Sequence, residues 1–144
     1  LRIISSRGFG PEFLGHFRIV RPRSAGCGTA LSEASRVAVG DVGCSALFAD
    51  SPSLSVMLRA KALAFVSTPL SNARGDVIGM VSAHWRKPYA AGVLEYRELD
   101  PVIAVARALM EKVQVAHRSG QPAFRERSRR WIRVLDGLKG GARA

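Results

Sequence analysis

The sequence lacks several features that define whole classes of protein. It holds only two cysteines, Cys27 and Cys44, in 144 residues, too few for the disulfide framework of a small secreted fold. No apolar run approaches the roughly 18 residues that a membrane-spanning helix requires. The N-terminus also lacks the basic, apolar and small-residue order of a signal peptide. We therefore expect reduced thiols and a cytoplasmic protein.

Side chains that bind metals are also scarce. Three histidines and two distant cysteines do not offer the three or four ligands, at suitable spacing, that zinc needs. His16 or His84 could ligate a haem iron, because neutral imidazole is a good iron ligand. A single histidine at a strand end is more often a hydrogen-bonded structural residue. We therefore expect no zinc site and no haem.

The length and composition favour one folded domain. Apolar residues make up 47% of the 144 residues, which is enough for one proper core and too little for two comfortable ones. Small and basic residues replace the apolar pattern near the end of the chain. We predict a domain over residues 1–118 and a separate basic tail over residues 119–144.

The net charge of +11 needs to be located before it is interpreted. Residues 121–144 hold seven Arg or Lys and two acidic residues, and the remaining excess is spread over 120 residues. The tail has no aromatic and basic interleaving of the kind that binds single strands, and one short basic helix has few anchors for an anionic membrane. We expect neither nucleic acid nor a membrane as partner.

Apolar residues of the tail recur at a spacing that places them on one side of a helix. If these side chains were exposed on a monomer, they would form an apolar patch that favours aggregation. We therefore expect this stripe to dock on the domain, on a second copy or on a following module. Its members are Phe124, Trp131, Leu135 and Leu138.

Two apolar, β-branched runs at residues 63–70 and 77–85 flank a polar break. Gly75 can supply the positive φ that a turn needs, while Asn72 and Asp76 can bond their own backbone. The pattern predicts a β-hairpin. Since both runs are apolar at nearly every position, we expect both strands in the middle of a sheet rather than at its edge.

The remaining periodicity predicts further strands and helices. Their order, with a long helix last, favours an α+β domain whose mainly antiparallel sheet carries helices on its faces. The predicted strands are residues 1–6 and 36–42, and the predicted helices are residues 12–20, 24–35, a segment of 47–63 beginning at Ser51 and Pro52, and 94–117. Pro101 is expected to kink the last helix or to restart it after Asp100.

Two of these helices carry more specific predictions. Small residues in SAGCGTALSEAS at 24–35 permit close backbone approach, either to a neighbouring strand or to a ligand. The helix over 94–117 is amphipathic and should turn one stripe inward. That stripe is Leu99, Val102, Ile103, Ala106, Leu109, Met110 and Val113.

Five stretches, taken in order, carry a family resemblance. They are RGF at 7–9, SAGCGTAL at 24–31, VAVGDV at 37–42, STPLSNARGDVIGMVSAHW at 67–85 and LDPVIAVARALME at 99–111. In their order and spacing they resemble a GAF domain of the bacterial signalling type, often found upstream of a histidine kinase. The resemblance covers residues 1–115, and the tail lies outside it.

The resemblance implies a six-stranded antiparallel sheet with the terminal helices on one face and a small-molecule pocket on the other. In that family a first helix and a first strand precede the segment that resembles residues 1–6. A neighbour of the hairpin is then expected upstream of this sequence, or from another copy of the chain. The resemblance also implies a homodimer and a signalling output module such as a histidine kinase.

The pocket would hold a few polar groups among apolar side chains, which is the general form of a small-molecule site. Aromatic and Met residues at helical spacing are, however, usually just core. The residues proposed for this pocket are Phe13, Phe17, Cys27, Leu31, Leu54, Met57, Ser67, Ser82 and His84.

Specific ligands of the family are not indicated by these residues. Bilin-binding members attach their chromophore through a cysteine usually followed by histidine, whereas Gly28 follows Cys27 and Ser45 follows Cys44. The Asn-Lys-Phe-Asp-Glu set of cyclic-nucleotide-binding members is not found. The ligand therefore stays unknown.

We predict a non-enzymatic sensory or regulatory domain in bacterial signal transduction, in which a ligand or a change in dimer packing biases the helix over 94–117. A domain that binds no ligand and serves only to dimerise is an equal alternative. An alternative is a cysteine-dependent redox enzyme similar to the GAF-type methionine sulfoxide reductases. There Cys27, at a helix N-terminus, would act with His84 as base. The simpler interpretation is that Cys27 fills a tight contact between helix and sheet.

Overall fold

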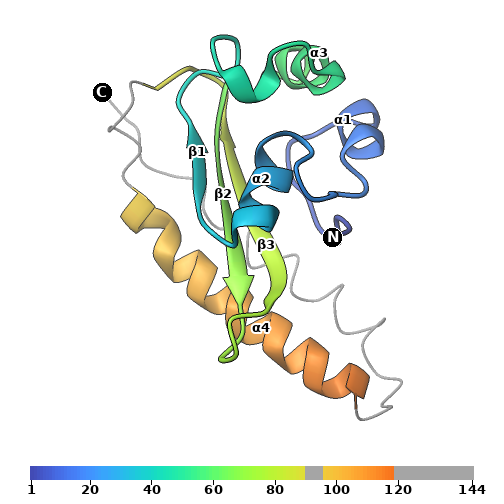
Figure 1. Ribbon diagram of the computed structural model, residues 1–144, viewed down its shortest axis with the longest axis vertical. Helices are drawn as coiled ribbons and strands as arrows, with labels where there is room; N and C mark the ends of the chain where they lie inside the picture. Colours follow the sequence, from blue (N-terminus) through green and yellow to red (C-terminus); the bar gives the residue numbers. More distant parts are fainter. Residues whose placement is uncertain (90–95, 119–144) are drawn as a thin grey trace.

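The computed structural model describes residues 1–89 and 96–118 and is a mixed α+β fold (Figure 1). Its three-stranded antiparallel sheet has the order β1, β2, β3. The elements are α1 (Pro11–His16), α2 (Ala25–Glu33), β1 (Val37–Val39), the 3₁₀ helix η1 (Ala46–Phe48), α3 (Pro52–Arg59), β2 (Ala64–Ser71), β3 (Val77–Trp85), the 3₁₀ helix η2 (Tyr96–Leu99) and α4 (Asp100–Arg118).

The predicted hairpin is confirmed. β2 and β3 pair in register from Ala64 opposite Trp85 onward, with a register shift beside the turn. In the turn, the Oδ1 of Asn72 accepts the backbone N–H groups of Arg74 and Asp76 at 2.9 and 3.0 Å. Gly75 has φ +85°, a conformation in which a side chain is strained. The turn is therefore formed by Asn72, Gly75 and Asp76, as the sequence predicts.

Alternate residues of β2 serve opposite faces of the sheet, because side chains alternate along a strand. Phe65 packs with α1 and α3, whereas Leu70 packs with Ile103 of α4. Figure 1 shows α4 crossing one side of the strands and α2 lying on the other. The larger apolar cluster, on the α2 side, holds Phe13, Val39, Val42, Phe48, Val56, Met57, Ala62 and Phe65.

The sequence predicts both hairpin strands in the middle of the sheet, and this prediction is correct for β2 but not for β3 in the described sheet. β2 is central and almost wholly buried, but β3 is mostly half-buried and has β2 as its sole neighbour in the sheet that the structure describes. The apolar pattern of β3 comes from α4 beneath it. An apolar strand therefore need not be a central strand.

The predicted strand over residues 1–6 is wrong. Arg2 forms a single bridge with Ile19, and the backbone N–H of Val20 donates to the carbonyl of Leu1 at 2.8 Å. This local pairing uses the backbone of residues 18–20, so α1 ends at His16 rather than continuing to Val20 as predicted.

Helices α2 and α3 lie where the pattern predicts them. Ser51 caps α3, because its Oγ accepts the N–H of Ser53 at 3.2 Å and Pro52 follows it. The strand predicted over 36–42 shortens to β1, since residues after Val39 leave the ladder.

The long terminal helix is confirmed over α4, which begins at Asp100 rather than at residue 94. Leu99, Ile103, Ala106 and Met110 of the predicted inward stripe pack against the hairpin. Residues 90–95 and the tail over 119–144, with its predicted apolar stripe, lie outside the described residues. No helix of the described part reaches the length and apolar character of a membrane span.

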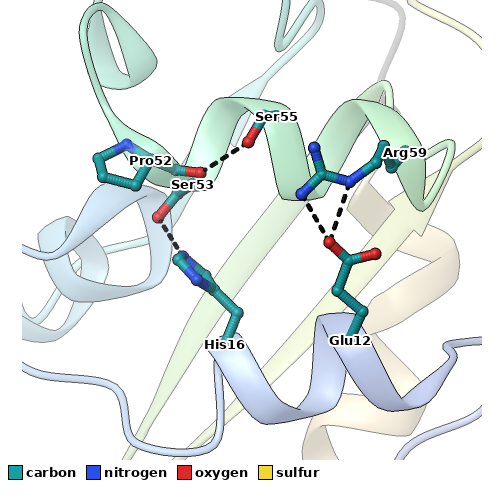
Figure 2. Close-up of polar contacts among 6 residues, drawn as sticks. All are labelled: Glu12, His16, Pro52, Ser53, Ser55 and Arg59. Carbon is teal, nitrogen blue, oxygen red and sulfur yellow. Dashed lines mark hydrogen bonds and ion pairs between the residues drawn. The ribbon is translucent and has the colours of Figure 1, made fainter.

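Polar contacts join α1 to α3 on the surface (Figure 2). The Nη2 and Nε of Arg59 donate to Oε1 of Glu12 at 2.6 and 2.9 Å, and Nε2 of His16 lies 2.9 Å from the Oγ of Ser53. Because Glu12 and Arg59 are exposed, their ion pair contributes only about 0–1 kcal/mol. The apolar contacts beneath, among Phe13, Val56 and Met57, hold the two helices together.

The small residues at the start of α2 serve close packing with the protein itself. A methyl group at Gly26 would overlap the ring of Phe65 on β2, and one at Gly28 would overlap the carbonyl of Arg21. Of the two alternatives left open by the sequence, a neighbouring strand is the one that the structure places against Gly26.

Replacing Gly26 with alanine is therefore expected to destabilise the fold. The added methyl must displace the buried Phe65 ring, and overpacking of this kind costs about 1–3 kcal/mol. The free energy of unfolding from urea denaturation measures the change. Gly15→Ala is the matched control, because nothing lies within 4 Å of that position, and it should leave stability equal or slightly higher. Equal effects of the two substitutions would contradict the packing interpretation.

Candidate functional site

Three polar side chains meet on the α2 side of the sheet. The Sγ of Cys27 lies 3.1 Å from the Oγ of Ser67 and 3.4 Å from the Oγ of Ser82, and the two serine hydroxyls are 2.9 Å apart. We call these residues the Cys27 cluster. Each member is within hydrogen-bond distance of the other two, so the three groups form a closed triangle.

The backbone positions this triangle directly. Ser67 and Ser82 are opposite each other in the β2–β3 register, and Cys27 lies in the first turn of α2. α2 lies close to β2 because Gly26 has no side chain, which lets the ring of Phe65 pack directly against the helix backbone. Ser67 is fully buried and Ser82 is exposed, so the cluster extends from the interior to the open side of β3.

His84 lies two residues beyond Ser82 among aromatic rings. The ring centroids of Phe9, Phe13 and Phe65 are 5.0, 5.6 and 5.9 Å from its own. Within the described residues its Nδ1 is buried and has no hydrogen-bond partner. This burial lowers the pKa of His84 from about 6.5 to about 4, so its imidazole is neutral at physiological pH.

The structure brings together only part of the set predicted for the pocket. Cys27, Ser67 and Ser82 form the cluster, and Phe13 contacts the neighbouring His84 through its ring. Phe17, Leu54 and Met57 pack in the larger apolar cluster, as aromatic and Met residues at helical spacing usually do. Leu31 is half-buried on α2 and belongs to neither apolar cluster of the described residues.

Two residues of this region were not predicted. Phe9 stacks on Phe13 at 3.9 Å and meets the His84 ring edge-on, and Phe65 lies opposite His84. The alternation along β2 could have identified Phe65, because it is two residues before Ser67 and therefore shares its face. The coil before α1 gave no comparable signal for Phe9.

The chemistry available here is neutral hydrogen bonding beside aromatic surface. A thiol, two hydroxyls and a neutral imidazole can each donate or accept. A Cys27 nucleophile with His84 as base would need the imidazole at the thiol, but in the described part of the chain Nδ1 of His84 has no hydrogen-bond partner and the thiol lies beside two serine hydroxyls. Among the described residues, no three His, Cys, Asp or Glu side chains gather as metal ligands.

A second set of polar side chains occupies the opposite face of β2. Arg36, just before β1, donates from Nε to the Oγ1 of Thr68 at 3.0 Å and from Nη2 to Oδ1 of Asp100 at 2.9 Å. Asp100 is the first residue of α4. Thr68 follows Ser67 directly, so of two adjacent residues in β2 one belongs to the Cys27 cluster and the other is linked through Arg36 to the start of α4.

The burial of neutral His84 predicts a pH dependence of stability. Its folded pKa lies below its unfolded value, so the folded state resists protonation. Stability should be complete above about pH 6.5 and should fall as the pH drops towards about 4. A shift of this size corresponds to an upper limit of about 3–4 kcal/mol in the free energy of unfolding. Denaturant unfolding at a series of pH values measures the loss.

His84→Phe is expected to remove this component, because the phenyl ring suits the aromatic surroundings and has no nitrogen to protonate. His16→Gln is the matched control: His16 is exposed, so that variant should keep the pH dependence of the wild type. An unchanged pH dependence in His84→Phe would show that other groups cause it.

The two thiols should differ in alkylation by iodoacetamide. Cys27 is half-buried and should stay protected until the protein unfolds. Cys44 is exposed, but its hydrogen bond to Asp41 raises its pKa. Less thiolate is then present at neutral pH, so Asp41→Asn should accelerate its modification. Peptide mass spectrometry assigns each site, and rapid pH-dependent modification of Cys27 near neutrality would instead support chemistry at that thiol.

Comparison with known proteins gives no relative from which to transfer a function. No family model, curated protein or solved structure matches this chain. The functional interpretation therefore depends on the residues and geometry described above.

Proposed function

We propose that this chain is a GAF-like sensory domain that binds a small molecule at the Cys27 cluster and signals through α4. One observation carries the proposal: the Cys27 cluster and the Nδ1 of His84, which has no hydrogen-bond partner among the described residues, lie on one face of β2 and β3, while α4 packs on the opposite face of the same strands. The resemblance to GAF domains implies this arrangement of pocket and terminal helix.

The groups of the site favour an uncharged ligand with a flat apolar part. Thiol, hydroxyl and neutral imidazole groups offer hydrogen bonds without charge, and the rings of Phe9 and Phe13 beside His84 offer apolar surface. A few polar groups within apolar surroundings fix the orientation of a ligand. An ionised ligand would lose its hydration here and find no opposite charge among these side chains.

The signal passes through adjacent residues of β2. A ligand that bonds Ser67 changes the contacts of one face, and Thr68 on the other face holds Arg36, which pairs with Asp100 at the start of α4. A ligand shifts a conformational equilibrium by its differential affinity for the two states. We infer that the position of the first turn of α4 is the state that the ligand selects, and that an output module such as a histidine kinase receives it.

Native mass spectrometry of the protein as purified, without any added ligand, tests the binding step. The wild type should carry an additional mass of a small molecule. Ser67→Ala should lose most of that mass, because a buried polar contact is removed and the partner groups are left unsatisfied. Ser71→Ala is the matched control, since it changes a half-buried serine at the end of the same strand and should retain the additional mass.

Two outcomes would contradict the proposal. The wild type could be bare under every gentle condition of purification, or the Ser67→Ala variant could retain the same additional mass as the wild type. Circular dichroism of each variant ensures that a loss of ligand does not reflect unfolding.

A further inference from the structure

Helix α4 is apolar on two opposite sides. Its inward side, with Ile103, Ala106 and Met110, packs on the hairpin. About half a turn away a second apolar stripe is exposed, in which Val105 and Val115 keep 56% and 67% of their surface. Surface helices normally carry charged and polar residues on the side away from the core. The exposed members of this outer stripe are Pro101, Ala104, Val105, Ala108 and Val115.

The outer stripe consists mostly of small side chains. Within residues 1–89 and 96–118, α4 packs on β2, β3 and η2, and the outer stripe stays exposed. Well-packed helices set large side chains against small ones. Two copies of α4 that met along this stripe would place alanine against alanine and bury little apolar area. A segment that fits the stripe therefore supplies large apolar side chains at helical spacing.

The apolar stripe of the tail has this property and a matching spacing. Its four members advance along the chain by 7, 4 and 3 residues. Four members of the outer stripe recede along α4 by the same 7, 4 and 3 residues. Equal spacings that run in opposite directions fit two antiparallel helices. The matched pairs, with the tail residue first, are Phe124 with Val115, Trp131 with Ala108, Leu135 with Ala104 and Leu138 with Pro101.

The connection between the two segments favours the same register. α4 ends at Arg118, and the sequence continues with Gly120 and Pro122, residues typical of the end of one helix and the start of the next. Two antiparallel helices joined by a loop of two to five residues form an αα-hairpin. Residues at equal distances from the loop centre then lie opposite each other. A loop centred on Gly120 places Trp131 within one residue of Ala108.

We propose that residues 124–138 form a helix that packs antiparallel on the outer stripe of α4 in the same chain. The short connection holds the tail at a high local concentration, which favours its own α4 over that of a second copy. α4 then lies between the hairpin on one side and the tail on the other. The contact uses no member of the Cys27 cluster, so it does not depend on the ligand proposed above.

The charges beside the outer stripe agree with this register. Glu111 and Lys112 are exposed and flank the stripe on opposite sides. In the antiparallel register Arg127 lies on the side of Glu111, whereas the small Ser128 lies on the side of Lys112. Charged residues that flank an apolar contact between helices select partner and orientation. The register that matches the apolar residues therefore also pairs opposite charges and separates like ones.

Engineered cysteine pairs test the register in the full chain. The background carries Cys44→Ser, because Cys44 is exposed and would compete for oxidation. Ala104→Cys with Leu135→Cys places two thiols opposite each other, and copper phenanthroline should oxidise them to a disulfide within one chain. Ala104→Cys with Ser128→Cys is the matched control, because it is about 10 Å out of register, too far for a disulfide. Mass spectrometry of unreduced peptides identifies the bonds.

Fluorescence of Trp131 tests the docking itself. A Trp85→Phe background leaves Trp131 as the single tryptophan, and its indole should be protected from acrylamide quenching at every protein concentration. Ala108→Arg places a charge at the centre of the contact and should abolish this protection. Ser55→Arg is the control, because Ser55 is exposed on α3, which packs on α1 and η1. Circular dichroism verifies the fold of each variant.

Several results would overturn the proposal. Equal disulfide yields in the two cysteine pairs would show that the tail has no such register. Disulfides that join two chains, or a protection of Trp131 that disappears on dilution, would assign the outer stripe to a second copy. An indole that acrylamide quenches freely in the Trp85→Phe protein would show that the tail does not dock. Protection that survives Ala108→Arg would place the tail on another surface.

Discussion

The structure depends on the contact between the ring of Phe65 and the backbone of Gly26. Phe65 is fully buried near the start of β2 and touches Phe48, His84 and the apolar side chains of α1 and α3. Because Gly26 has no side chain, α2 approaches the strand closely enough for Cys27 to reach Ser67 and Ser82. The same contact thus completes the core and positions the site.

Much of the fold could be predicted because its signals are local. The turn at Asn72 and Gly75, the cap at Ser51 and the inward stripe of α4 each follow from residues close together in the sequence. The neighbours of a strand depend on residues far away in the sequence: β3 is apolar because α4 covers it, and β2 is its one neighbour in the sheet of the described residues. The prediction of a strand over residues 1–6 is wrong for a related reason: the backbone of Leu1 pairs with that of Val20, and this pairing is not visible in the local sequence.

The site could be predicted in its polar part and not in its apolar part. Ser67 and Ser82 are recognisable because polar side chains are rare on the two hairpin strands, and the register places them opposite each other. Cys27 is recognisable as a thiol between two glycines at the start of a helix. Phe17, Leu54 and Met57 share a helical spacing with any residue that faces a core, so their pattern does not separate ligand contacts from packing. That Nδ1 of His84 has no hydrogen-bond partner within residues 1–89 and 96–118 depends on the three-dimensional packing and could not be predicted from the sequence.

The tight hairpin turn also has a consequence for the order of folding. Residues 72–76 alone connect β2 to β3, whereas Val39 of β1 meets Phe65 across the whole of α3. Since the entropic cost of closing a chain grows with loop length, the hairpin is the contact that forms early at the lowest entropic cost. α4 packs on β2 and β3 and so requires a finished hairpin as its surface. The helix that we propose for signal output therefore docks only after the hairpin has formed, and it can detach while the hairpin stays paired.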